Sequence, residues 1–135
     1  MAPERLQVVS NTPVASEQAI VGTGRKAVTF APTIKMSTYL LAFVVGELEA
    51  SEPIMIGVTP LRIWSIPGKT HLTAFAREIA AFSLAFFEQY YGLPYPGEKL
   101  DLLAIPDFAA GAMENLGAIT FRETALLVDA GAASH

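Results

Sequence analysis

Residues 70–94 read THLTAFAREIAAFSLAFFEQYYGLP, and apolar residues recur in them at intervals of three and four. This spacing predicts an amphipathic helix with one apolar stripe, which we expect to lie in the core. The stripe consists of Leu72, Phe75, Ile79, Phe82 and Phe86. Thr70 is a suitable N-cap, Gly92 suits the left-handed position after the last turn, and Pro94 prevents the helix from continuing.

On either side of this helix the sequence has the pattern of β-strands. Strands are predicted at residues 6–10, 27–30, 38–47, 61–65, 99–105, 118–121 and 124–128. The apolar, β-rich run 38–47 is predicted to be a central strand that is buried on both faces. Strands alone are expected before residues 58–60, whereas strands and the helix alternate after them. The sequence therefore predicts an α+β chain in two parts, residues 1–59 and 60–135.

The composition excludes several classes of protein. The 135 residues include 9 Lys and Arg against 13 Asp and Glu, and this net charge of −4 argues against a nucleic-acid-binding protein. There is no cysteine for a disulfide or a metal site. The longest clean apolar run, residues 39–46, is far shorter than the about 20 residues that a membrane helix needs. The N-terminus also lacks the pattern of a secretion signal, so we expect a cytoplasmic protein.

Few side chains suggest catalysis by themselves. The two histidines, His71 and His135, have neither HExxH spacing nor a third ligand, so no zinc site is predicted within the chain. The serines form no nucleophile motif. Residues 22–24, GTG, lack the third glycine of a dinucleotide-binding loop and are predicted to form a hairpin turn.

Residues 106–123, PDFAAGAMENLGAITFRE, contain the strongest candidate site. Gly111 and Ala112 leave the backbone open to close approach by another chain, and the carboxylate of Glu114 follows directly. A peptide that adds as a strand here would gain main-chain hydrogen bonds and one specific contact with Glu114. On physical grounds alone, the alternative is that Glu114 is simply a solvated residue of a surface loop.

The pentapeptide GAMEN at Gly111–Asn115 is the exopeptidase motif of the aminopeptidase N family of zinc metallopeptidases, and the chain resembles that family. Residues 95–108 before the motif and 117–123 after it resemble the runs that flank it in the family. KMSTYL at residues 35–40, with FVVG at 43–46, resembles the last strands of the family's N-terminal β-domain. The resemblance covers nearly the whole chain and is weakest at its two ends.

The resemblance implies that residues 1–59 end a β-saddle domain and that residues 60–135 open a thermolysin-like catalytic domain. The family's zinc ligands, an HExxH pair and a later glutamate, lie downstream of the GAMEN motif, at positions beyond His135. We therefore expect an internal piece of a zinc aminopeptidase that has no catalytic or metal-binding residue and is inactive alone. The composition, 52% hydrophobic and 16% charged, then reflects faces that pack against the rest of the parent protein.

Carried onto this sequence, the family's motif assigns Glu114 to the protonated α-amine of a peptide substrate. The pKa of a free α-amino group is about 7.7–8.0, so much of it is cationic near neutral pH. Gly111, Ala112 and Met113 are expected to lie along the peptide, and Asn115 to hold the geometry of the loop. Two alternatives stay open: a non-catalytic binding or scaffold relative, and an epoxide-hydrolysing relative, which tends to have a second glycine in place of Ala112.

Overall fold

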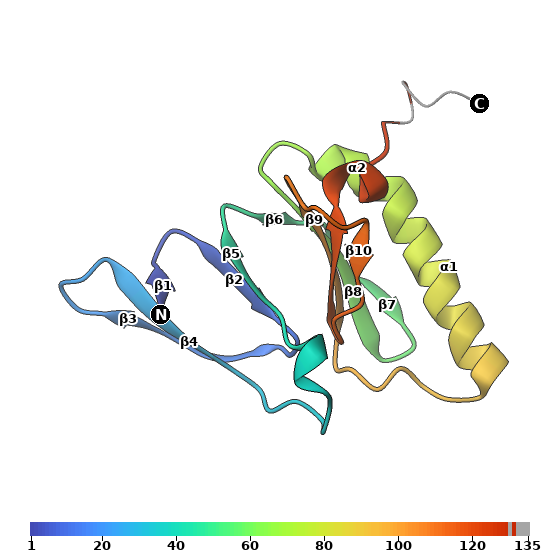
Figure 1. The fold of residues 1–135 in the computed structure, drawn as a ribbon, viewed down its shortest axis with the longest axis horizontal. Helices are drawn as coiled ribbons and strands as arrows, with labels where there is room; N and C mark the ends of the chain where they lie inside the picture. Colours follow the sequence, from blue (N-terminus) through green and yellow to red (C-terminus); the bar gives the residue numbers. More distant parts are fainter. Residues whose placement is uncertain (130, 132–135) are drawn as a thin grey trace.

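The computed structural model describes residues 1–129 and 131, so His135 lies outside the described residues. Figure 1 shows a large sheet in the middle of the molecule, with the long helix α1 on one side and the N-terminal strands on the other. The strands are β1 (Ala2–Pro3), β2 (Gln7–Ser10), β3 (Val14–Ile20), β4 (Arg25–Phe30), β5 (Phe43–Gly46), β6 (Glu49–Ala50), β7 (Ile54–Ile56), β8 (Thr59–Ser65), β9 (Leu100–Ile105), β10 (Ala112–Met113) and β11 (Ala118–Arg122). The helices are η1 (Thr38–Leu40), η2 (Thr70–Thr73), α1 (Ala74–Tyr91) and α2 (Glu123–Leu126). These elements confirm the α+β class.

The large sheet is built around a strand–helix–strand unit. Its order is β10-β11-β9-β8-β6, and β7 also pairs with β8. Strands β8, β9 and β11 are parallel, and α1 supplies the crossover from β8 to β9 that parallel neighbours require. Five consecutive residues of β9, from Leu100 to Ala104, are buried. Strand β9 is therefore the strand that is covered on both faces.

Alternate residues of β9 point into two different cores, as the two-residue period of a strand requires. The core on the helix side consists of Leu61, Ile63, Ala76, Leu100, Leu102, Ala104 and Leu126. On the opposite face, Leu103 packs with Val9 of β2 and Ala118 of β11. The large sheet thus separates the helical layer from the N-terminal strands, and its second core attaches β2 to it.

The prediction of a central strand at residues 38–47 was wrong. Residues 38–40 form η1, and only Phe43–Gly46 form a strand, β5, which pairs with β2. Phe43 is 73% exposed, and the exposure of the strand alternates along its length. An apolar run does not reveal that one of its faces is uncovered. The true central strand, β9, contains Asp101, whose charge makes the run less apolar than 38–47.

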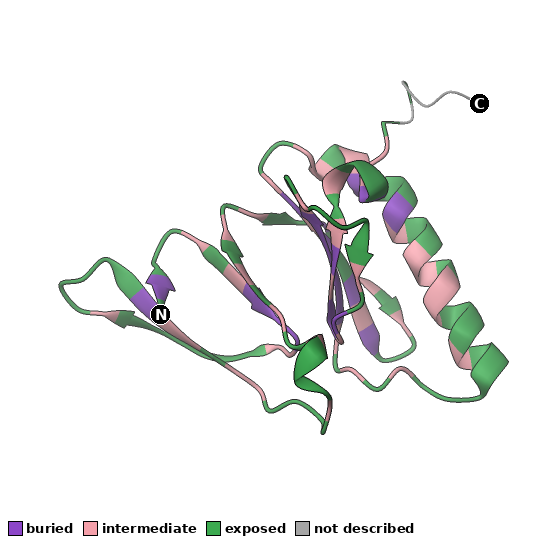
Figure 2. Ribbon diagram, in the orientation of Figure 1, coloured by how far each residue is buried: buried purple, intermediate pink, exposed green. Residues whose placement is uncertain are grey.

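Helix α1 is present, but its predicted core stripe is not its buried face. Gly92 ends the helix in the left-handed conformation, φ 63°, as predicted. Ala76 is buried, and Ala80 and Leu84 pack against the same core one and two turns later. Four residues of the predicted stripe are exposed instead, namely Phe75, Ile79, Phe82 and Phe86. Figure 2 shows that much of the surface of α1 is exposed. Because the alanines are small, they allow the helix to lie close to the sheet, and the phenylalanines remain on its flanks and outer side.

Two further local predictions were wrong. Thr70 does not cap α1; it begins η2, and its hydroxyl donates to Glu49 Oε2 over 3.0 Å. Residues 124–128, predicted to be a strand, lie largely in helix α2. The carboxylate of Glu123 in the first turn favours a helix here, and it pairs with Lys69 Nζ at 2.8 Å.

The N-terminal strands form two small antiparallel sheets, β1-β4-β3 and β2-β5. Residues 22–24 lie in the turn between β3 and β4, where Gly22 and Gly24 have positive φ, so the predicted hairpin turn is confirmed. The expected boundary at residue 59 falls at the β7–β8 hairpin, whose two strands both belong to the large sheet. The division into two domains stays a prediction.

Candidate functional site

The GAMEN motif lies at an edge of the large sheet, in the segment that connects β9 to β11. Strand β10 pairs antiparallel with β11, with Ala112 opposite Phe121 and Met113 opposite Thr120. The N–H of Arg122 also donates to the carbonyl of Gly111 over 2.9 Å. In the part of the chain that the structure describes, β10 pairs with β11 alone. Its other edge therefore presents backbone groups to which an extended peptide can bind.

The side chain of Arg122 holds the beginning of this segment. Its Nε donates to the carbonyl of Phe108 over 3.0 Å, and its Nη2 donates to the carbonyl of Ala109. Asp107 has φ 55°, a left-handed conformation that aspartate tolerates better than most residues. These contacts determine where the chain leaves β9 and how it approaches β10.

The carboxylate of Glu114 is exposed next to β10 and has a hydrogen-bond donor from a distant part of the chain. The hydroxyl of Tyr39 donates to Glu114 Oε1 over 3.1 Å. Tyr39 belongs to η1, where Ser37 Oγ accepts a hydrogen bond from the N–H of Tyr39 over 3.2 Å. The structure thus brings the predicted site residue Glu114 together with a tyrosine that the sequence did not single out.

The hydrogen bond to Glu114 and the negative charge of that residue raise the pKa of the Tyr39 phenol above its usual value of about 10. Deprotonation of Tyr39 removes the donated hydrogen bond and places two negative charges side by side. We therefore expect Glu114→Gln to lower the pKa of Tyr39 towards its usual value. An ultraviolet titration of phenolate, with a Tyr39→Phe variant subtracted to isolate this residue, measures the change. Identical Tyr39 titrations in both proteins would contradict the contact.

Asn115, the last residue of the motif, points inward. It is 4% exposed, and its Nδ2 lies 3.3 Å from the carbonyl of Met113 and 3.4 Å from Thr120 Oγ1. Its carbonyl accepts from the N–H of Ala118 over 3.1 Å. All these contacts join the motif to itself or to β11.

A second asparagine, Asn11, connects the end of the motif segment with η1. It is 3% exposed, and its Nδ2 donates to the carbonyls of Leu40 and Leu116 over 2.8 and 2.7 Å. Its Oδ1 accepts from the N–H of Ala42 over 3.0 Å. Gly117 lies against the Asn11 backbone, and a Cβ there would lie 2.0 Å from the Asn11 carbonyl oxygen. One buried side chain therefore holds the neighbours of Tyr39 and Glu114 together.

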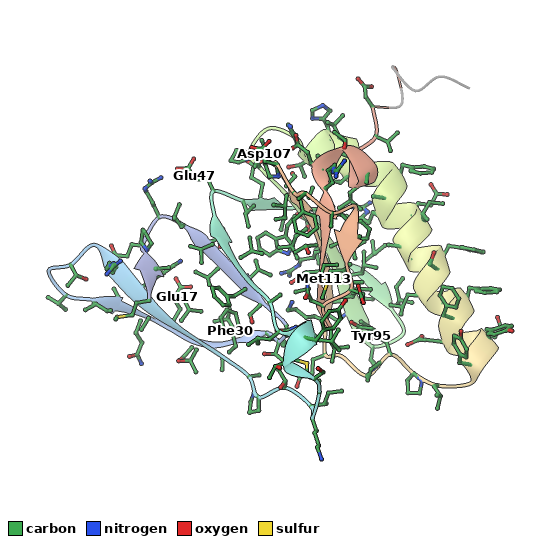
Figure 3. All side chains as sticks on the ribbon, viewed as in Figure 1. Glu17, Phe30, Glu47, Tyr95, Asp107 and Met113 are labelled. Atoms are coloured by element: carbon green, nitrogen blue, oxygen red, sulfur yellow. The ribbon has the colours of Figure 1, made fainter. Side chains whose placement is uncertain are left out.

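A buried ion pair, Lys99 with Asp101, stabilises the contact between Asn11 and the segment after the motif. Lys99 Nζ lies 2.6 Å from Asp101 Oδ2 and donates to the carbonyls of Ser10 and Gly117, each over 2.7 Å. Burial lowers the pKa of Lys99, and the attraction of Asp101 opposes that shift. The hydroxyl of Tyr95, labelled in Figure 3, accepts from the N–H of Gly117 over 2.9 Å. The pKa of Tyr95 is raised, chiefly by burial.

An open groove lies beside the motif, between β5 and β10. It is lined mostly by apolar side chains, namely those of Leu41, Ala42, Phe43, Val44, Val45, Ile105, Phe108 and Met113, together with Asn115 and Thr120. Met113, labelled in Figure 3, faces this groove from the motif. Residues from both faces of β5 line this groove, so the edge of β5 that is not paired with β2 forms one wall of a groove beside the candidate site.

Sequence reasoning did not predict that Tyr39 or Asn11 belongs to the site. Tyr39 lies in a run that resembles the family, whereas nothing in the sequence marks Asn11. Tyr39 belongs to the run KMSTYL that resembles the family, but nothing in that run indicates a contact with the motif. Among the described residues, no group of three His, Cys, Asp or Glu side chains is arranged to hold a metal ion, and His71 is exposed. The described residues therefore do not fit a zinc site.

Residues 75–135 match the model of the peptidase family M1 domain, so this part of the chain belongs to the M1 family of peptidases. Proteins that are named aminopeptidases are similar to this chain over most of its length.

Three of these relatives come from distant organisms. Aminopeptidase 2 of Candida albicans is 45% identical over 130 residues, which cover 96% of this chain and 14% of that protein. The puromycin-sensitive aminopeptidase of Caenorhabditis elegans is 43% identical over 129 residues, covering 96% of this chain and 14% of that protein. Endoplasmic reticulum aminopeptidase 1 of Homo sapiens is 41% identical over 122 residues, covering 90% of this chain and 13% of that protein. The chain spans about 14% of the length of the first two relatives.

No helix in residues 1–129 has the length and apolarity needed to cross a membrane. One relative is named for the endoplasmic reticulum. The cytoplasmic location stays a prediction.

Proposed function

We propose that this chain is part of an enzyme that removes N-terminal residues from peptides, and that residues 111–115 recognise the free α-amine of the substrate. The observation that carries the proposal is the exposed carboxylate of Glu114 beside the open edge of β10. Membership of a family whose relatives are named aminopeptidases supports the reaction class.

The site suits a peptide whose chain begins at Glu114. The peptide backbone pairs with the open edge of β10, and its terminal ammonium then lies against the carboxylate. A hydrogen bond to a charged group contributes roughly 1.5–3 kcal/mol, so a peptide without a free amine binds much more weakly. The contact also selects the bond that is cleaved. Because the terminal amine is bound at Glu114, the first peptide bond of every substrate lies at the same distance from that residue.

The remaining motif residues have supporting roles in this proposal. Gly111 and Ala112 leave room for the peptide backbone. Met113 lines the groove beside β5, which receives the first side chain of the substrate. Asn115, whose contacts stay within the motif and β11, keeps the loop in shape.

The same proposal assigns the remaining chemistry to residues outside this chain. The zinc that the family resemblance implies, together with the water it activates, would be held there, so residues 1–135 contribute recognition rather than bond cleavage. Residues 1–59 would belong to a β-domain and 60–135 to the catalytic domain. The exposed aromatic side of α1 would pack against the remainder of an enzyme with the length of the relatives, called the full-length enzyme below.

Glu114→Gln in the full-length enzyme is expected to lower kcat/KM for an aminoacyl reporter by about 10- to 100-fold, because the ammonium loses its charged partner. The loss should appear as a higher KM. Steady-state kinetics with the free-amine reporter measure it, and competition by a dipeptide and its des-amino analogue identifies the group involved.

The matched control is Glu4→Gln, which changes an exposed glutamate outside the motif and outside α1 in the same way. It should leave kcat/KM unchanged. If Glu114→Gln also has no effect, or if it weakens both competitors equally, Glu114 does not recognise the amine.

A further inference from the structure

The two oxygens of Glu114 are in different situations. Oε1 accepts the hydrogen bond from Tyr39, and no hydrogen bond to Oε2 is found among the described residues. An exposed glutamate is free to rotate about three side-chain bonds, and a partner on one oxygen restricts that freedom. A carboxylate that is oriented before the ligand arrives loses less entropy on binding. The geometry therefore leaves Oε2 free for a ligand.

The chemical nature of the partner is equally important. Tyr39 is a neutral donor, and no lysine, arginine or histidine forms an ion pair with Glu114 in the described part of the chain. A cationic partner would neutralise the carboxylate and compete with a substrate ammonium. A phenol fixes the carboxylate and leaves its negative charge available.

Hydrogen bonds from Asn11 and Ser37 support the contact between Tyr39 and Glu114. Asn11 holds the carbonyls of Leu40 and Leu116 on one amide group, so the segments that carry Tyr39 and Glu114 cannot separate without breaking its hydrogen bonds. The Ser37 cap fixes the turn that presents the tyrosine. The hydrogen bonds of Asn11 thus keep the two backbone segments close enough for the side chains of Tyr39 and Glu114 to make contact.

We propose that Tyr39 is a positioning residue for substrate recognition: its hydroxyl binds Glu114 Oε1 and directs Oε2 towards the α-ammonium of the peptide. This inference rests on the proposed function of Glu114. It adds a residue from the N-terminal part of the chain to a recognition loop that otherwise lies wholly within residues 111–115.

Tyr39→Phe in the full-length enzyme tests the proposal, because it removes only the hydroxyl of an exposed side chain. We expect kcat/KM for the free-amine reporter to fall about fivefold, through a higher KM at an unchanged kcat. Tyr91→Phe is the matched control: it removes the same hydroxyl from α1, keeps the ring that would pack against the rest of the enzyme, and should leave both constants unchanged. A fall in kcat alone, or no change, would overturn the proposal.

A double-variant cycle separates this inference from the function on which it rests. If Tyr39 acts through Glu114, Tyr39→Phe has no further effect in the Glu114→Gln protein. An additive loss in the double variant would mean that Tyr39 acts independently of Glu114, and the inference would be wrong. If Glu114→Gln itself is silent, the proposed function fails first. If Glu114→Gln is active and Tyr39→Phe is silent, the positioning role alone fails.

Discussion

Gly117→Ala is expected to destabilise the protein by about 3 kcal/mol or more, because two costs add at this position. Gly117 has φ 74°, where a residue with a side chain is strained. The new methyl carbon would lie 2.0 Å from the carbonyl oxygen of Asn11, a backbone atom that cannot rotate away. Urea unfolding of the 135-residue chain, followed by the fluorescence of its single tryptophan, Trp64, measures the loss.

Gly46→Ala is the control for this substitution. Gly46 has no positive φ, and its added methyl carbon would make an ordinary contact with Leu48 Cγ at 3.8 Å. Its effect should stay within about 1 kcal/mol, the size of the conformational difference between Gly and Ala within a strand. Equal losses in the two variants would show that the close approach to Asn11 is unimportant.

Lys99→Met is expected to cost about 3–5 kcal/mol, the range typical of breaking one side of a buried ion pair. It leaves Asp101, whose side chain is 6% exposed, as a buried carboxylate without its cation. The carbonyls of Ser10 and Gly117 also lose their shared donor. The same unfolding measurement reports the change.

Two comparisons identify the cause of that loss. Lys69→Met removes one side of a more exposed pair with Glu123, and it should cost less than about 1 kcal/mol. The double variant Lys99→Met/Asp101→Leu removes the stranded charge, so it should recover part of the stability lost in Lys99→Met. No recovery would mean that the buried charge is not the main cost.

The sequence predicted what is local and missed what depends on distant contacts. The helix end at Gly92 and the turn at residues 22–24 follow from conformations that glycine adopts readily, and the structure confirms both. Which face of α1 is buried depends on how closely the sheet approaches it, and no helical period contains that information. The strand at residues 99–105 was predicted, but its central position was not, because Asp101 is charged and only its pairing with Lys99 allows that charge to be buried.

The same distinction between local and distant contacts applies to the candidate site. Residues 111–115 are contiguous, so a motif was sufficient to locate them. Their supports are far apart in sequence: Tyr39 lies 75 residues from Glu114, and Asn11 lies 105 residues from Leu116. A long-range contact through one hydroxyl or one amide leaves no periodic pattern in a single sequence.

The span of the Asn11 bridge has a consequence for the order in which the molecule assembles. During synthesis, residue 11 emerges long before residue 116, so this bridge cannot close until nearly all of the described chain is available. Closing so long a loop carries an entropic cost that the contacts repay only afterwards. The hairpin of β3 and β4 and the helix α1 depend on near neighbours and form without waiting. The bridge between Asn11 and the segment after the GAMEN motif is thus among the last contacts to form, and a nascent chain that has made most of its secondary structure still lacks it.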